Sequence, residues 1–189
     1  MNIELRLWSG SEVNSAYVNA HNKSRSKYYS SQGERKFDKS DIEQQIRDGL
    51  EKGDCYFYGV YQVNCHDLIG TVKIQHINKK NKTGDVVPFI FNEQYFKYKL
   101  GAQIIKLGCK IAFDEFNLRK IFGGVSKSNI GSVKTFLKSN YVVEGIRKGH
   151  LLEDGIPIDE ILVACFNKKF FNKAHFEQYD ITFEDIYAV

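Results

Sequence analysis

The spacing of hydrophobic residues changes in the middle of the chain. Three segments before residue 92 are rich in β-branched and aromatic residues and are separated by turn signals, which predicts antiparallel strands in series. These segments are 55–63, 68–77 and 83–91. Beyond residue 99, apolar residues recur at the spacing of one helix face, in a stripe of Leu100, Ile104, Leu107 and Ile111. A fold with this order must combine a sheet and helices.

Periodicity elsewhere completes an α+β pattern. Further strands are expected at 3–7, 121–125, 141–146 and 156–166, and helices at 11–21, 40–52, 100–116 and 128–139. Ser11 is expected to cap the first helix, and Ser40 with Glu43 to form a capping box for the second. The order β-α-α-β-β-β-α-β-α-β-β predicts one mixed, mostly antiparallel sheet of seven strands flanked by four helices. Residues 168–189 show no clear period.

Composition limits the class of protein. The chain has 189 residues, which suits one domain, and 27 basic against 23 acidic residues, a net charge of +4 that is too small to demand nucleic acid. The four cysteines lie far apart without metal-ligand spacing, so we expect buried free thiols, a reducing compartment and no metal. The first apolar stretch carries Glu4 and Arg6, unlike a signal peptide, and no apolar run suits a membrane span. These features predict a cytoplasmic protein without membrane attachment.

The segment 92–102 carries the clearest chemical signal. A strand ends, a loop with Lys97 and Lys99 follows, and a long helix begins near Gly101. Unpaired N–H groups at a helix N-terminus attract anions, and glycine allows a phosphate to approach the backbone. The segment therefore indicates an anion site suited to a phosphate or diphosphate, or else a solvated basic loop before an ordinary helix.

The order of several short motifs resembles the GNAT superfamily of acetyl-CoA-dependent N-acetyltransferases, in particular its ribosomal-protein N-terminal acetyltransferase branch. The resemblance covers residues 3–167 and leaves 168–189 as a C-terminal extension. Its landmarks are 68–73, 92–102, 112–120, 129–132, 140–145 and 154–159. It implies a splay between the fourth and fifth strands, acetyl-CoA as co-substrate, and direct attack by a primary amine in a ternary complex. It leaves open a small acceptor, such as an amino-sugar nucleotide, or a protein N-terminus, and a homodimer or a monomer.

The resemblance also implies which residues bind the cofactor. The family's phosphate loop, Gln/Arg-x-x-Gly-x-Gly/Ala, matches Phe96, Lys99 and Gly101, so only the last glycine is retained. The backbone near Ile90 and Phe91 matches the strand that pairs with the pantetheine arm and the thioester carbonyl. The full set expected to contact the cofactor is Ile90, Phe91, Phe96, Lys97, Tyr98, Lys99, Leu100, Gly101, Ala102 and Asn129.

Acid–base roles are open to several residues. The acceptor amine must lose a proton before it attacks. The resemblance implies a carboxylate base on the strand before the phosphate loop, where Asp85 lies within about one residue of the matching position, and His76 is the alternative candidate. Asp159 matches an acidic position that the resemblance associates with substrate orientation or with pairing to the base. The family tyrosine that protonates the departing thiolate is Phe136 in this sequence.

Two alternatives to an active enzyme remain at this stage. One is a catalytically silent relative that binds CoA. The other is a nucleic-acid-binding module that uses the aromatic and basic residues 95–99, although basic residues are scattered along the chain. The basic, aromatic segment 23–39 and the tail after Lys168 are expected to shape the choice of acceptor.

Overall fold

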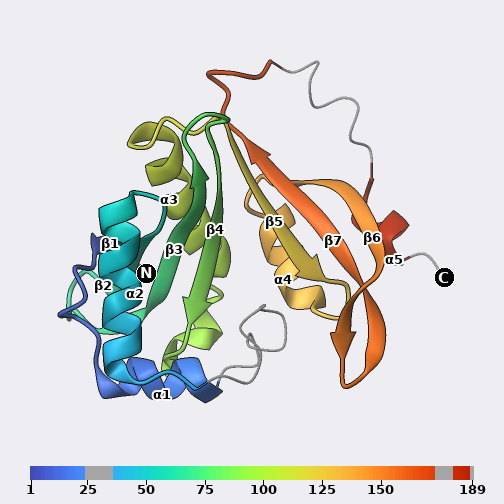
Figure 1. Ribbon diagram of the computed structural model, residues 1–189. Helices are drawn as coiled ribbons and strands as arrows, with labels where there is room; N and C mark the ends of the chain where they lie inside the picture. Colours follow the sequence, from blue (N-terminus) through green and yellow to red (C-terminus); the bar gives the residue numbers. More distant parts are fainter. Residues whose placement is uncertain (24–35, 173–180, 188–189) are drawn as a thin grey trace.

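A computed structural model describes residues 1–23, 36–172 and 181–187, so most of the segment 23–39 lies outside the described residues. Its described residues form one sheet of seven strands in the order β1-β2-β3-β4-β5-β7-β6 (Figure 1). The strands are β1 (Ile3–Leu7), β2 (Tyr56–Gln62), β3 (Leu68–Asn78), β4 (Thr83–Ile90), β5 (Lys120–Ser126), β6 (Val142–Glu153) and β7 (Ile156–Phe166). The β4–β5 pair is parallel and the other pairs are antiparallel, which confirms the predicted mixed sheet.

The sheet opens between β4 and β5. These strands pair only at Thr83↔Lys120, Gly84↔Ile121 and Asp85↔Phe122. Beyond Asp85, β4 follows β3 as far as Ile90, whereas β5 follows β7 as far as Ser126, so the two strands diverge (Figure 1). The predicted splay is therefore present, and Asp85 lies at its closed end.

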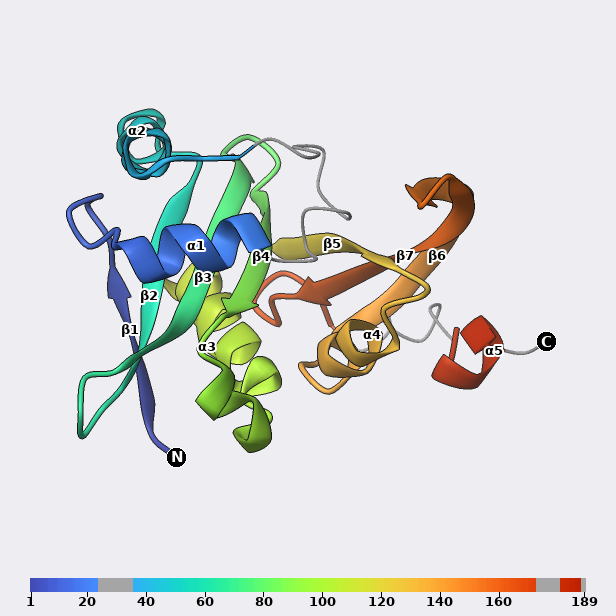
Figure 2. The same cartoon turned by 90° about the horizontal axis from the view of Figure 1, so that it is seen from below.

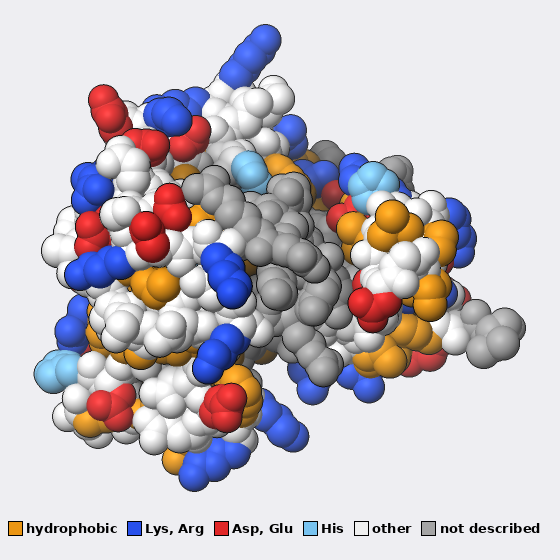
Figure 3. All heavy atoms as spheres, turned by 60° about the horizontal axis from the view of Figure 1, so that its bottom comes forward, with side chains coloured by type: hydrophobic (Ala, Val, Ile, Leu, Met, Phe, Trp, Pro, Cys, Tyr) orange, Lys and Arg blue, Asp and Glu red, His pale blue; other side chains and the backbone are white. Residues whose placement is uncertain are grey.

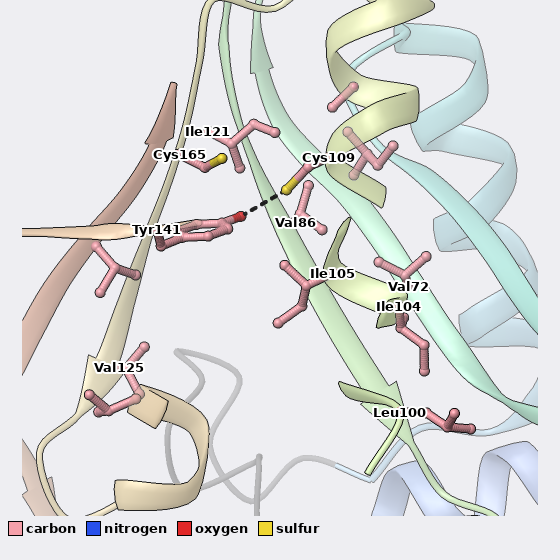
Figure 4. Packing of buried hydrophobic residues seen from close by; sticks show 14 of the residues in the cluster. Val72, Val86, Leu100, Ile104, Ile105, Cys109, Ile121, Val125, Tyr141 and Cys165 are labelled. Carbon is pink, nitrogen blue, oxygen red and sulfur yellow. Dashed lines mark hydrogen bonds between the residues drawn. The ribbon is translucent and has the colours of Figure 1, made fainter. Parts of the chain in front are cut away.

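Helices cover both faces of the sheet. Figure 2 shows α1 (Ser15–Lys23) and α2 (Lys39–Lys52) on one face, and α3 (Gly101–Asp114) and α4 (Ile130–Leu137) on the other. A small core that includes Trp8, Tyr17 and Phe57 lies under α1 and α2. The larger core lies under α3 and α4. Within it, the Tyr141 hydroxyl is 3.4 Å from Cys109 Sγ (Figure 4).

The caps of the first two helices differ from the prediction. Asn14, not Ser11, accepts a hydrogen bond from the Tyr17 N–H, at 2.9 Å, and α1 starts four residues later than expected. In α2 the capping box joins Asp38 and Asp41, because Asp38 has the extended backbone that an N-cap needs. The predicted end of α2 is correct, since Gly53 follows it with φ 66°.

Two short helical segments were not expected. A 3₁₀ helix, η2 (Glu93–Tyr98), fills the loop after β4, and α5 (Phe183–Tyr187) forms near the C-terminus. Each is too short to show a periodic hydrophobic pattern. Ile186 of α5 is buried, and the Tyr187 hydroxyl donates to the Lys127 carbonyl at 2.9 Å, so α5 packs beside the β5–α4 connection.

The four cysteines differ in burial. Only Cys109 and Cys165 are buried; Cys65 is exposed and Cys55 is intermediate, so the prediction of buried thiols is half wrong.

Figure 3 faces the end where β4 and β5 diverge and shows hydrophobic side chains on the β6–β7 hairpin, where Leu152 is 65% and Ile156 62% exposed. Within the described ranges, no helix has the length and apolar character to cross a membrane.

Candidate active site

The carboxylate of Asp85 spans the closed end of the splay. A Cβ on Gly123 of β5 would lie 3.6 Å from Asp85 Oδ1, so this oxygen faces β5. The other oxygen, Oδ2, accepts a long hydrogen bond from Gln75 Nε2 at 3.4 Å and lies 3.8 Å from His76 Nδ1. The Asp85 side chain is only 17% exposed. A partly buried carboxylate with such long contacts is free to interact with a ligand in the gap.

A break in the β3–β4 register brings His76 to Asp85. The register shifts between Gln75 and Asn78, and His76 has φ 53°, so Gln75 and His76 both approach the same carboxylate. The nearby Asp85 carboxylate raises the pKa of His76 above its ordinary value. The His76 side chain is 67% exposed, which connects the buried carboxylate to solvent. The two alternative candidates for the base therefore form a pair.

Asp159 lies at the other end of the gap. Asp85 pairs with Phe122, which pairs with Ala164, and Asp159 precedes Ala164 by five residues on β7, roughly 16 Å at strand spacing. Its Oδ1 accepts from the Gly149 N–H at 3.0 Å, and its Oδ2 lies 3.0 Å from Lys148 Nζ. These contacts lower the pKa of Asp159, the Gly149 bond most of all. The structure does not bring Asp159 to the Asp85–His76 pair, and its contacts hold the bent β6–β7 hairpin.

The backbone of β4 presents different groups to its two neighbours. The Phe91 N–H donates to the Ile69 carbonyl at 3.3 Å, so this donor faces β3 and is not available to a ligand in the gap. Because successive N–H groups of a strand point to opposite sides, the Ile90 N–H faces the gap. Pro88 lies on the same side as Ile90, where a missing N–H breaks no bond to β3. Of the two predicted backbone contacts, the geometry favours Ile90.

The start of α3 has the features of an anion site. The first N–H groups of the helix, beginning at Gly101 and Ala102, lack intrahelical partners. The N-cap residue, Leu100, has no polar side-chain atom that could replace them. Lys99 adopts φ 52°, the left-handed conformation that glycine supplies most easily, and its N–H donates to the Phe96 carbonyl at 3.1 Å. The loop thus reaches the helix without the family's first glycine.

The side chains of this loop vary in exposure. Phe96 is 54% and Tyr98 49% exposed, and Lys97 Nζ lies 5.1 Å from the centre of the Tyr98 ring. Tyr95, which the nucleic-acid alternative would need at the surface, is buried, and its hydroxyl lies 2.8 Å from Asp67 Oδ2. This bond fixes η2 against the β2–β3 hairpin and raises the pKa of Tyr95.

Gly101 lies where the start of α3 packs on the C-terminal half of α4, and Asn129 lies at the opposite end of α4. A Cβ on Gly101 would lie 3.0 Å from Thr135 Cγ2, so helix packing alone explains this glycine. Asn129 is the N-cap of α4, and its side-chain oxygen accepts from the Ser132 N–H at 3.1 Å. This leaves only the amide NH₂ of Asn129 for a cofactor. Phe136, at the position of the family's acid, packs on Tyr141 with ring centres 5.0 Å apart.

A groove of about 620 Å³ runs along α2, and Gln75 and His76 form part of its wall. Three aspartates, Asp41, Asp48 and Asp54, contribute to its walls. No cluster of His, Cys, Asp and Glu suited to a metal ion occurs in the described parts of the chain.

Comparisons with known proteins identify the family and agree with the fold. A family model described as an acetyltransferase (GNAT) domain matches residues 13–162. The chain is 27% identical over 140 residues to a probable N-acetyltransferase, YjcK, of Bacillus subtilis (strain 168), a match that covers 74% of this chain and 75% of that protein.

Solved structures share the fold at low identity. Spermidine N-acetyltransferase from Vibrio cholerae in complex with CoA and spermine matches with a TM-score of 0.72 at 18% identity, covering 90% of this chain and 98% of that one. A putative ribosomal-protein-serine acetyltransferase from Vibrio cholerae matches with a TM-score of 0.66 at 19% identity, covering 88% and 95% of the two chains. The family model spans most of the sheet and both sides of the splay, so this chain belongs to the GNAT acetyltransferase family and is an acyltransferase.

Proposed function

We propose that this chain transfers the acetyl group of acetyl-CoA to a primary amine by direct attack in a ternary complex. The observation that carries the proposal is the position of Asp85, whose two oxygens face β5 across the gap and the His76 side of β3. The acceptor is a small amine, such as an amino-sugar nucleotide, or a protein N-terminus of the kind used by ribosomal-protein acetyltransferases. A fold neighbour that was solved with CoA and spermine supports an amine as acceptor.

The start of α3 is suited to the diphosphate of acetyl-CoA. Unpaired N–H groups at Gly101 and Ala102 would hold the phosphate oxygens, and Lys97 and Lys99 add positive charge nearby. The Ile90 N–H, which faces the gap, would donate to the thioester oxygen as negative charge develops on it. One such donor contributes roughly 3 kcal/mol to the transition state.

Asp85 and His76 provide a path for the proton of the acceptor. A primary amine with a pKa near 10 is mostly protonated at neutral pH and cannot attack. Asp85 would accept this proton, directly or through water, and His76 would pass it to solvent. A thiolate whose conjugate acid has a pKa of about 8.5 can leave without an acid, which is consistent with Phe136 in place of a tyrosine.

A thiol-release assay tests the proposal. Wild-type protein is incubated with acetyl-CoA and a panel of amino-sugar nucleotides, peptides and polyamines, and the acetylated product is identified by mass spectrometry. We expect turnover of at least one amine and loss of that turnover in Asp85→Asn.

Phe136 favours one competing function, a silent relative that binds CoA without chemistry. If acetyl-CoA stabilises both the wild type and Asp85→Asn against heat and neither releases thiol, the silent function is supported and the proposed transferase activity is contradicted. Stabilisation of Asp85→Asn together with lost turnover assigns Asp85 to chemistry rather than to cofactor binding.

A further inference from the structure

Lys73 is a half-buried lysine in the middle of a strand whose central residues are buried. It lies in β3, paired with Phe57 of β2 and Val87 of β4, on the face covered by α1 and α2. Its Nζ lies 5.2 Å from the centre of the Phe57 ring. Among the described residues this ammonium group has no hydrogen bond or ion pair. Because burial of an unpaired charge is unfavourable, such a group requires a compensating partner.

Lys73 and Asp85 lie on the same face of the sheet. Cross-strand pairing places Lys73 opposite Val87 and Gln75 opposite Asp85, so Lys73 and Asp85 are diagonal neighbours. Diagonal neighbours in an antiparallel pair are separated by about 8 Å or less. Burial lowers the pKa of Lys73, and the charge of Asp85 opposes that shift only in part.

His21 is a second polar group without a partner near the same face. Its Nδ1 is fully buried and has no hydrogen bond among the described residues. Its ring packs against Phe37 and Phe89, with ring centres 5.4 and 6.3 Å apart, and Phe89 shares the face of Lys73 and Asp85. Lys73 and burial together lower the pKa of His21, with burial the larger cause.

We propose that Lys73 and His21 bind an anionic group of the acceptor, so that the substrate is an amine with a carboxylate or phosphate within about 8 Å of its reacting nitrogen. The inference rests on the proposed function and narrows its substrate class. The amine would reach Asp85 at the closed end of the splay, while the anionic group supplies Lys73 with its missing partner. A polyamine such as spermidine carries further positive charges and would meet Lys73 unfavourably, whereas the aspartates of the groove along α2 would favour it.

Matched amines separate these outcomes. The pairs are γ-aminobutyrate with butylamine, for a carboxylate, and phosphoethanolamine with ethanolamine, for a phosphate; spermidine is the polycation. In at least one pair, we expect kcat/KM to be at least about tenfold higher for the amine that carries the carboxylate or phosphate than for its partner without that group. In Lys73→Gln this advantage disappears, while the affinity for acetyl-CoA stays unchanged. Lys52→Gln, on the wall of the groove along α2, retains the advantage.

Several outcomes would overturn the inference. They are spermidine as the best acceptor, equal rates within both pairs, or an anion preference that survives Lys73→Gln. If Lys73→Gln instead shifts the pH profile equally for every amine, Lys73 influences the protonation of the acceptor nitrogen and does not bind an anionic group. Calorimetric titration of the CoA-saturated protein with both pairs separates this inference from the proposed function. Lys73-dependent binding without turnover would contradict only the proposed function, and turnover without preference would contradict only the anionic subsite.

Discussion

The two ends of β4 serve the site in different ways. At the end paired with β5, a side chain carries the chemistry: Asp85 faces the gap and approaches Gln75 and His76. At the open end, the groups that face the gap are backbone groups, the Ile90 N–H and the free N–H groups that begin α3. Side-chain identity should therefore matter most at the closed end, and backbone conformation at the open end.

The two candidate carboxylates show the same contrast. Asp159 has a hydrogen bond from the Gly149 N–H and two lysines nearby, at 3.0 and 3.9 Å. Asp85 has only long contacts and faces a gap. A carboxylate with short contacts to its neighbours stabilises the fold, whereas one with unused capacity is available for a ligand.

The largest expected effect is at the closed end. Asp85→Asn should lower kcat by about 10²–10⁴-fold, because the amide cannot accept the acceptor's proton. The affinity for acetyl-CoA should change little, as measured by calorimetry. Asp159→Asn is the matched control, and we expect its turnover to stay within a few-fold of wild type. Comparable losses in the two variants would break the contrast between the ends.

Asp159→Asn should instead change stability in a pH-dependent way. The pKa of Asp159 is lowered in the folded state, so its stabilising contribution is present above the unfolded-state value and is lost as the pH falls through the folded-state value. Urea midpoints of wild type and variant should therefore differ at neutral pH and converge in acid. A constant difference across this range would assign the loss to packing.

A further prediction concerns the pH dependence of turnover. Because Asp85 raises the pKa of His76, kcat/KM should fall as the pH drops through a value above the ordinary 6.5 of histidine. His76→Gln should move or remove this limb. An NMR titration of His76 should show its pKa returning toward the ordinary value in Asp85→Asn. An unchanged titration in that variant would contradict the pairing of the two residues.

Sequence patterns predicted the order of strands and helices along the chain, because alternation and helix periodicity persist over long segments, whereas the splay was implied by the family resemblance. They also singled out Asp85 and His76, but they could not join them, since a register shift at Gln75–Asn78 brings the two together. A cap depends on local backbone angles, so Asp38 could not be distinguished from Ser40 by residue type. Lys73 did have a signal, a charged residue within a strand otherwise rich in apolar residues, which was not interpreted as functional.

A smaller effect is expected at the N-terminus of α4. Asn129→Ala removes the cap of α4 and should lower the free energy of unfolding by about 1 kcal/mol. Asn129→Asp retains a capping oxygen but removes the amide NH₂ and adds negative charge. If that NH₂ contacts the cofactor, the aspartate variant should bind acetyl-CoA more weakly than wild type while remaining as stable in urea. Equal affinity would limit Asn129 to capping.

The smallest effect is expected at Lys99, and it tests the open end directly. A left-handed lysine costs about 1–2 kcal/mol, and glycine in its place loses part of that gain to the entropy of the unfolded chain, so Lys99→Gly should stabilise the protein by about 0.5 kcal/mol. Lys97→Gly is the matched control: it removes the same charge within η2, where φ is not positive, and should destabilise by about 0.5–1 kcal/mol. Urea unfolding measures both changes. If backbone conformation dominates at this end, acetyl-CoA should bind Lys99→Gly within a few-fold of wild type. A much larger loss of affinity in Lys99→Gly than in Lys97→Gly would instead make the Lys99 side chain a specific contact of the diphosphate, and the contrast between the two ends of β4 would fail.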